Sequence, residues 1–170
     1  MLFNARAAHE RVWFEDLSAR FAAAKSVSQR LLFPIPLEFE PVLAAALGEY
    51  RTWLNQQGFE LEEFGRHFFR LEAVPDWLDP ARAEGFLRDL AELARERGGA
   101  GALRDEVIAK LAATRAVRLG DHPSEDEIRN LAQRLLSTRQ PLTCPRGHPT
   151  FVELGASDLA RRLGGDAEGL

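Results

Sequence analysis

The sequence predicts an α+β fold, in which a mixed α/β body is interrupted by a helical insert. In residues 1–74, segments with the two-residue period of strands alternate with segments with the 3.6-residue period of helices. From residue 75 to 140 the pattern is helical throughout, and a strand-like and a helical segment then close the chain. We therefore expect a discontinuous α/β body of residues 1–74 and 141–170, and a helical insert of residues 75–140.

Composition sets limits on the function. The 170 residues are 45% hydrophobic, which is enough to bury a core, and carry a net charge of −4. A stand-alone nucleic-acid binder would show a basic balance, so this class is disfavoured. No apolar run approaches the length of a membrane span, and a single cysteine cannot form an internal disulfide. We expect a cytoplasmic protein that does not contact a membrane.

The first elements are a short strand and a long helix. Leu2 and Phe3 resemble the end of a strand, and Asn4 can cap the helix that follows. Apolar side chains then recur every four residues between Arg6 and Ala24. This spacing predicts one buried helical face, made of Trp13, Leu17 and Phe21.

A strand is expected next, at residues 31–39. Its residues alternate, and we expect the odd-numbered positions to face the core and the even-numbered ones to face outward. Pro34 and Pro36 cannot donate to a ladder, so this strand should be an edge strand or be bulged. The predicted core positions are Leu31, Phe33, Ile35, Leu37 and Phe39.

Residues 41–58 form the second predicted helix, which Pro41 opens and Gly58 closes. Two strands should follow at residues 59–65 and 67–74. The helix carries an apolar stripe which, together with the strand at 31–39, exceeds what a small lobe can cover, and we expect a homodimer to bury it. The stripe consists of Leu43, Leu47, Tyr50 and Leu54.

Three helices fill the predicted helical insert. The first starts at Pro80 and ends at Gly98. The third begins with Ser124 and Glu127, a capping box, and must end before Pro141. The second lies between them and is marked by Leu103, Val107 and Leu111.

The stretch "PLTCPRGHPT", residues 141–150, precedes a strand at 150–154 and a last helix that Ser157 caps. Its Cys144 and His148 are both able to ligate zinc, but two ligands are too few for a closed site. A buried cysteine in a turn is the favoured interpretation.

Two other segments carry candidate chemistry. His9, Glu10 and Glu15 share a predicted helix, but the second histidine of a zinc protease motif is missing, which favours a solvated face. The stretch "QRLLFP" offers an amide and two apolar anchors to a partner, namely Gln29, Leu32 and Pro34. An ordinary half-buried strand is the alternative.

Together these segments resemble the C-terminal domain of the MutL family of DNA mismatch repair proteins. "NARAAHERVWFED" is similar to the family motif DQHA-x2-E-x4-E, and "CPRGHPT" to C-P-H-G-R-P-T. "LAATRAVRLG" lies where the family has its A-C-R helix, and "QRLLFPIPLEF" resembles the strand that carries a sliding-clamp motif, Q-x-x-L-x-P.

The departures from the family pattern affect its divalent metal site. Arginine replaces histidine at Arg6 and Arg146, and alanine replaces cysteine at Ala113. Arginine stays protonated and has no lone pair for a metal, so we expect no metal cofactor and expect the arginines to pair with acidic residues instead. The degenerate positions are Asn4, Arg6, Glu10, Glu15, Ala113, Cys144, Arg146 and His148. A rearranged site of His9, Glu10, Cys144 and His148 is the alternative.

The resemblance implies a two-lobed dimerisation domain without enzyme activity. Residues 1–74 and 141–170 would form a small mixed α/β dimerisation lobe, and residues 75–140 a mostly helical outer lobe. It would hold two chains together so that ATPase regions, N-terminal to this segment in the full protein, close around DNA and relay the mismatch signal. Implied partners are a second copy, the replication sliding clamp and, through the full-length protein, a mismatch-recognition protein, a helicase and DNA. ATP would be needed only in the N-terminal region. The alternatives are a metal-dependent DNA-nicking endonuclease and a docking module for the sliding clamp.

Overall fold

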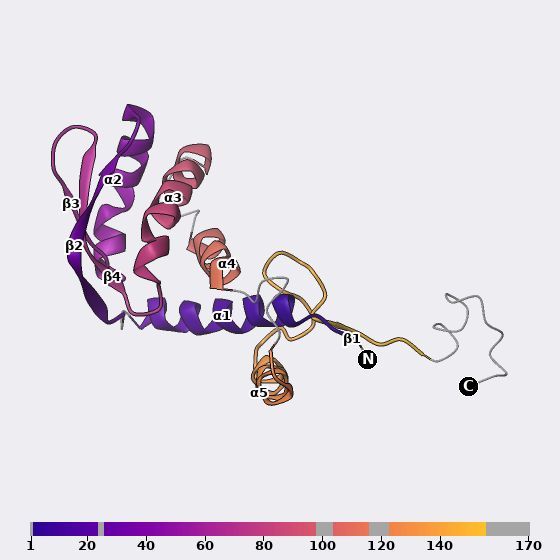
Figure 1. Cartoon of the computed structure of the whole chain (residues 1–170). Helices are drawn as coiled ribbons and strands as arrows, with labels where there is room; N and C mark the ends of the chain where they lie inside the picture. Colours follow the sequence, from indigo (N-terminus) through magenta and orange to yellow (C-terminus); the bar gives the residue numbers. More distant parts are fainter. Residues whose placement is uncertain (1, 24–25, 98–103, 116–122, 156–170) are drawn as a thin grey trace. The chain divides into compact units, whose positions relative to one another are not determined.

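A computed structural model describes residues 2–23, 26–97, 104–115 and 123–155, and the predicted helix at Ser157 lies outside them. The described part is of the mixed α+β class, as expected, with five α-helices and two small antiparallel sheets (Figure 1). None of its helices is long and apolar enough to cross a membrane. The elements are β1 (Leu2–Phe3), α1 (Ala5–Ala22), β2 (Ser28–Glu38), α2 (Pro41–Gln56), β3 (Glu60–Glu63), β4 (Phe68–Pro75), the 3-10 turn η1 (Pro80–Arg82), α3 (Ala83–Arg97), α4 (Arg104–Arg115), α5 (Glu125–Leu136) and β5 (Phe151–Val152).

The chain forms two compact units. Unit 1 combines the described parts of Met1–Glu15 and Ala112–Leu170, and unit 2 is Asp16–Leu111. The expected division into a dimerising lobe and an outer lobe concerns function, and it stays a prediction.

Several helix boundaries lie where the sequence predicts them. Pro41 occupies the first turn of α2, and Gly58, with a φ of 92°, follows the end of this helix. Ser124 and Glu127 form both hydrogen bonds of a capping box at the start of α5. These signals act locally, so tertiary packing does not override them.

Unit 2 contains a three-stranded sheet of order β2-β4-β3, and Figure 1 shows α2 and α3 lying together beside it. The strand β2 is therefore an edge strand, as its two prolines predict. It is also bulged: Arg30 pairs with Ala73 and Ile35 with Leu71, so residues 31–34 lie opposite Glu72 alone. Both expected consequences of the prolines are confirmed.

The bulge corrects one prediction about β2. Phe33 was expected in the core, but its exposed fraction is 78%, and that of Leu32 is 88%. Strict alternation of buried and exposed side chains holds only in a regular strand. It is lost here because four residues of β2 lie opposite one residue of β4. The regular part beyond the bulge behaves as predicted, with Leu37 and Phe39 buried.

The core of unit 2 is extensive and aromatic. Phe59 stacks on Phe86, with ring centroids 5.7 Å apart, and Trp77 meets both rings edge-on. The stripe of α2 packs into this unit, because Leu47, Tyr50 and Leu54 are buried. The expectation that this stripe needs a second chain to cover it was therefore wrong.

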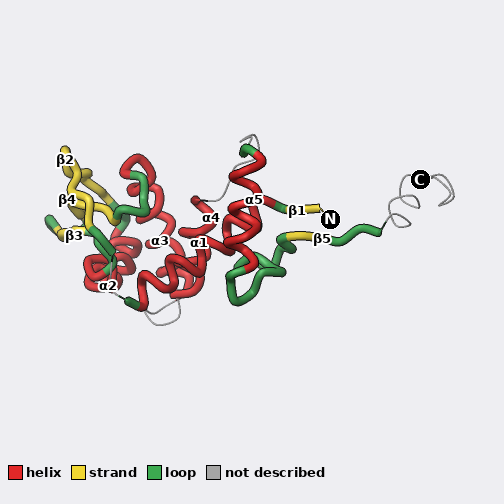
Figure 2. The backbone as a smooth tube through the Cα atoms, turned by 90° about the horizontal axis from the view of Figure 1, so that it is seen from below, coloured by secondary structure: helices red, strands yellow, loops and turns green. Residues whose placement is uncertain are grey.

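Unit 1 has a smaller core around the first half of α1. Asn4 caps this helix through its Oδ1, which accepts a hydrogen bond from the Ala7 amide at 3.1 Å. β1 and β5 pair in antiparallel register, Leu2 with Val152 and Phe3 with Phe151. In Figure 2 the segment between α5 and β5 is a folded loop, drawn in green. The apolar cluster consists of Ala8, Val12 and Leu135, with Phe3, Leu131 and Phe151 packed against it.

Candidate functional site

The segment Pro141–Thr150 folds into a tight loop held by its own backbone. The Cys144 amide donates to the His148 carbonyl at 2.8 Å, and the Gly147 amide donates to the Cys144 carbonyl at 2.9 Å. Gly147 adopts a φ of 82°, a conformation that favours glycine. Cys144 is a free, buried cysteine in this turn, as predicted.

Glu10 lies where α1 meets this loop. The glutamate is 1% exposed, and its carboxylate accepts hydrogen bonds from Arg146 Nε at 3.1 Å and from Arg146 Nη2. Arg6, one turn earlier on α1, places its Nε 3.5 Å from Oε1 of the same carboxylate. The expectation that the two arginines pair with an acidic residue is confirmed for Glu10.

Two further α1 side chains hold the same loop and the two residues that precede it. Arg11 is buried and donates from Nε to the Thr143 carbonyl at 2.6 Å. Glu15 accepts from the backbone amides of Arg139, at 2.8 and 2.9 Å, and of Gln140, at 3.4 Å. Charged groups on successive turns of α1 thus fix the loop to the helix.

The residues around Glu10 do not fit a divalent metal. Both carboxylate oxygens already accept from Arg146, and a second guanidinium lies beside them. Arginine has no lone pair to offer and would repel a cation at this distance. Within the described ranges, no group of three or more His, Cys, Asp or Glu is placed to hold a metal ion.

The other predicted site residues are dispersed. The backbone N–H of Asn4 donates to the Thr150 carbonyl at 2.8 Å, which ties β1 to the end of the loop. Ala113 lies in α4 and His148 is an exposed loop residue, and no described contact joins either of them to Glu10. His9 Nε2 accepts from Trp13 Nε1 at 2.8 Å, so it is engaged within α1.

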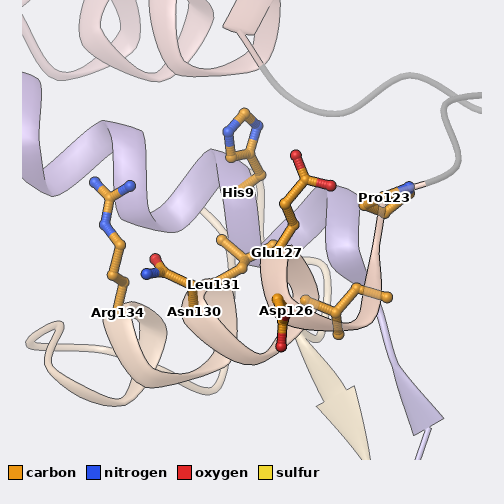
Figure 3. Close-up of a pocket in the computed structure, with 8 residues that line it drawn as sticks. His9, Pro123, Asp126, Glu127, Asn130, Leu131 and Arg134 are labelled. Atoms are coloured by element: carbon orange, nitrogen blue, oxygen red, sulfur yellow. The ribbon is translucent and has the colours of Figure 1, made fainter.

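A pocket of about 440 Å³ lies between His9 of α1 and the face of α5 that runs from Asp126 to Arg134 (Figure 3). Figure 3 shows His9 and Glu127 on its rim and Leu131 beneath them. Hydrogen bonds from the Ser124 backbone amide and hydroxyl hold the pKa of Glu127 below its usual value. The carboxylate on this pocket is therefore also the one that caps α5.

The candidate clamp motif lies in unit 2. Gln29 is exposed and pairs with Val74 in the regular part of β2. Leu32 and Pro34 belong to the bulged segment and are also exposed. The three residues therefore lie on the edge strand of the sheet, Gln29 in its regular part and Leu32 and Pro34 in the bulge that interrupts the ladder.

Sequence reasoning missed Arg11. Its spacing of four residues from Glu15 was a usable signal, because such pairs meet on one helix face. The contact with Thr143 was not predictable in this way, since 132 residues separate the two partners.

Comparison with known proteins identifies the family. Residues 1–123 match the model of the MutL C terminal dimerisation domain. The DNA mismatch repair protein MutL of Opitutus terrae is 49% identical over 96% of this chain, and that of Desulforudis audaxviator is 37% identical over 95%. The chain spans 26% and 29% of those two relatives, so it corresponds to about a quarter of their length. This chain belongs to the family of MutL C-terminal dimerisation domains.

Proposed function

We propose that this domain joins two chains of a mismatch repair protein and that unit 1 carries the contact between them. The observation that supports unit 1 is its small sheet with an exposed apolar face. β1 and β5 have two residues each and pair with each other. A ladder of this size adds little stability by itself, and packing against a second copy would stabilise it.

The outer face of this small sheet is apolar. Directly opposed residues share a face, and Phe3 and Phe151 pack on the unit 1 core. Leu2 and Val152 therefore occupy the opposite face, where they are 61% and 45% exposed. An apolar face on a short, open ladder is a surface that a two-fold partner would bury.

Joining the chains has a mechanical purpose. Two tethered ATPase regions meet at a much higher effective concentration than two free ones, so dimerisation favours their closure around DNA and the relay of the mismatch signal. The mismatch-recognition protein and the helicase would act through the full-length protein, in the cytoplasm. No chemical step in this domain is required.

We also propose that the domain does not cut DNA, because Arg146 and Arg6 are already paired with the Glu10 carboxylate, which a metal ion would need as a ligand. Supercoiled plasmid incubated with the domain and manganese should remain uncut. The variant that combines Arg6→His, Ala113→Cys and Arg146→His should gain manganese binding. Cutting by the unchanged domain that Glu10→Gln abolishes would establish the endonuclease alternative.

Docking to the replication sliding clamp is a second candidate function, favoured by the bulge in β2. Leu32 and Phe33 are the most exposed large apolar side chains that the structure describes, and they are adjacent. Burying each in a groove of the partner would contribute about 1.5 to 3 kcal/mol. Phe33 thus joins Gln29, Leu32 and Pro34 as an anchor.

The test is the pair Gln29→Ala and Leu32→Ala, assayed for clamp binding together with the mass of the domain in solution. Binding should be lost while the dimer mass is kept. Val42→Ala, another exposed apolar residue of unit 2, is the control and should bind normally. Unchanged clamp binding in the double variant would show that "QRLLFP" is an ordinary strand without a docking role.

A further inference from the structure

Two arginines share one carboxylate at the start of α1, which leaves a positive charge that Glu10 does not balance. Arg6 and Arg146 each carry one positive charge, and the side chains of both are about half exposed. The neighbouring Arg11 and Glu15 offset each other, 3.9 Å apart. The centre therefore carries one positive charge in excess.

Glu10 also fixes the geometry of this charge. It engages Arg146 through two of the five guanidinium N–H donors, and the other donors have no partner among the described residues. Both side chains are nearly half exposed, 48% for Arg6 and 44% for Arg146, so these donors are accessible to solvent. A buried acceptor thus holds two guanidinium groups in place while their free donors face solvent.

We propose that Arg6 and Arg146 form a binding site for a phosphodiester group of DNA. Pairs of guanidinium N–H donors match pairs of phosphate oxygens in geometry. A guanidinium group that Glu10 already holds in place loses less conformational entropy when it binds. The choice of DNA rests on the proposed role in mismatch repair, but the site needs neither the dimer nor the sliding clamp. The residues around Glu10, which do not fit a metal ion, would then bind the DNA backbone without cutting it.

Binding is measured by fluorescence anisotropy with a labelled duplex of about 20 base pairs, over a series of salt concentrations. Each phosphate contact contributes a slope of about 0.9 in the plot of log affinity against log salt. Arg6→Gln keeps the Arg146–Glu10 pair and the fold, and should lower the affinity several-fold and the slope by about one. Arg129→Gln is the control, because Arg129 is an exposed arginine of unit 1 that pairs with Asp126 instead.

A second variant separates charge from geometry. Arg146→Lys keeps the positive charge but loses the fork, so it should keep the salt slope and bind more weakly than the unchanged domain. Equal binding by Arg6→Gln and Arg129→Gln would overturn the proposal, as would an acidic peptide that binds through Arg6 when the duplex does not. The solution mass of the same samples tests the dimer separately, so either idea can fail alone.

Discussion

Unit 2 and unit 1 are stabilised in different ways. The structure describes eleven large side chains that are less than 2% exposed, and Leu135 is the only one of them in unit 1. Unit 1 relies on Glu10, Arg11 and Glu15, whose charged groups bind the loop at residues 139–150. The other ten are Leu17, Leu37, Leu47, Leu54, Phe59, Leu61, Leu71, Leu87, Leu90 and Leu111.

This difference supports the proposal that unit 1 depends on a partner. Burial of apolar area is the main favourable term in folding, and unit 2 obtains it within one chain. Unit 1 leaves Leu2, Leu142 and Val152 exposed, although its own core has few large residues. A second copy that covers such a surface would add the missing burial and make its stability depend on concentration.

The largest effect is expected in the aromatic core of unit 2. Phe59→Ala removes the ring that stacks on Phe86 and meets Trp77, and should lower the free energy of unfolding by about 3 to 5 kcal/mol. Urea denaturation followed by tryptophan fluorescence measures this loss. Leu32→Ala, in the exposed bulge of the same unit, should change the free energy by less than about 0.5 kcal/mol. Similar losses for the two variants would show that unit 2 has no dominant core.

In unit 1 the sensitive group is a charge. Glu10→Gln leaves Arg146 without its carboxylate and should cost about 2 kcal/mol, less than a fully buried pair because Arg146 is half exposed. Thermal unfolding at matched concentration measures the loss. The control is Glu84→Gln, which breaks the half-exposed pair with Arg88 and should cost less than about 1 kcal/mol. If both variants unfold alike, the ion pairs do not hold unit 1.

A smaller effect is expected at the start of α5. Ser124→Ala removes the hydroxyl that accepts from the Glu127 amide at 3.3 Å, and should cost about 1 kcal/mol. Ser137→Ala, near the other end of the helix, does not touch the cap and is the matched control. Equal melting of the two variants would mean that the cap does not contribute.

The same cap predicts a dependence on pH. Because the folded pKa of Glu127 is lowered, its contribution is present above the unfolded value, about 4.3, and is lost as the pH falls through the lower folded pKa. The acid-induced loss of stability in this range should therefore be smaller in Ser124→Ala than in the unchanged domain. An identical acid profile would contradict the assigned hydrogen bonds.

Local signals in the sequence predicted most of the fold. The cap at Asn4, the capping box at Ser124 and the prolines of β2 each act within a few residues, so they give element boundaries and the bulge directly. The direction of Phe33 was not predictable, because it depends on how many residues of β2 lie opposite Glu72 of another strand. Non-local pairing of this kind has no short-range signature.

The candidate site was predictable in its chemistry and not in its distances. The presence of arginine at positions 6 and 146 was enough to predict ion pairs with an acidic residue. The sequence did not distinguish Glu10 from Glu15 as the partner, since both lie on α1 and the choice depends on where the loop crosses the helix. The role of Arg11 depends on the same crossing.

The most direct test of the account is the mass of the domain in solution, measured by light scattering at micromolar concentration. The unchanged domain should have the mass of two chains. Val152→Asp places a charge on the apolar face of the β1–β5 pair and should give the mass of one chain. Leu32→Asp places the same charge on an exposed apolar residue of unit 2 and should keep the mass of two. A monomeric unchanged domain, or a dimer that Leu32→Asp dissociates and Val152→Asp does not, would contradict the claim that unit 1 joins the chains.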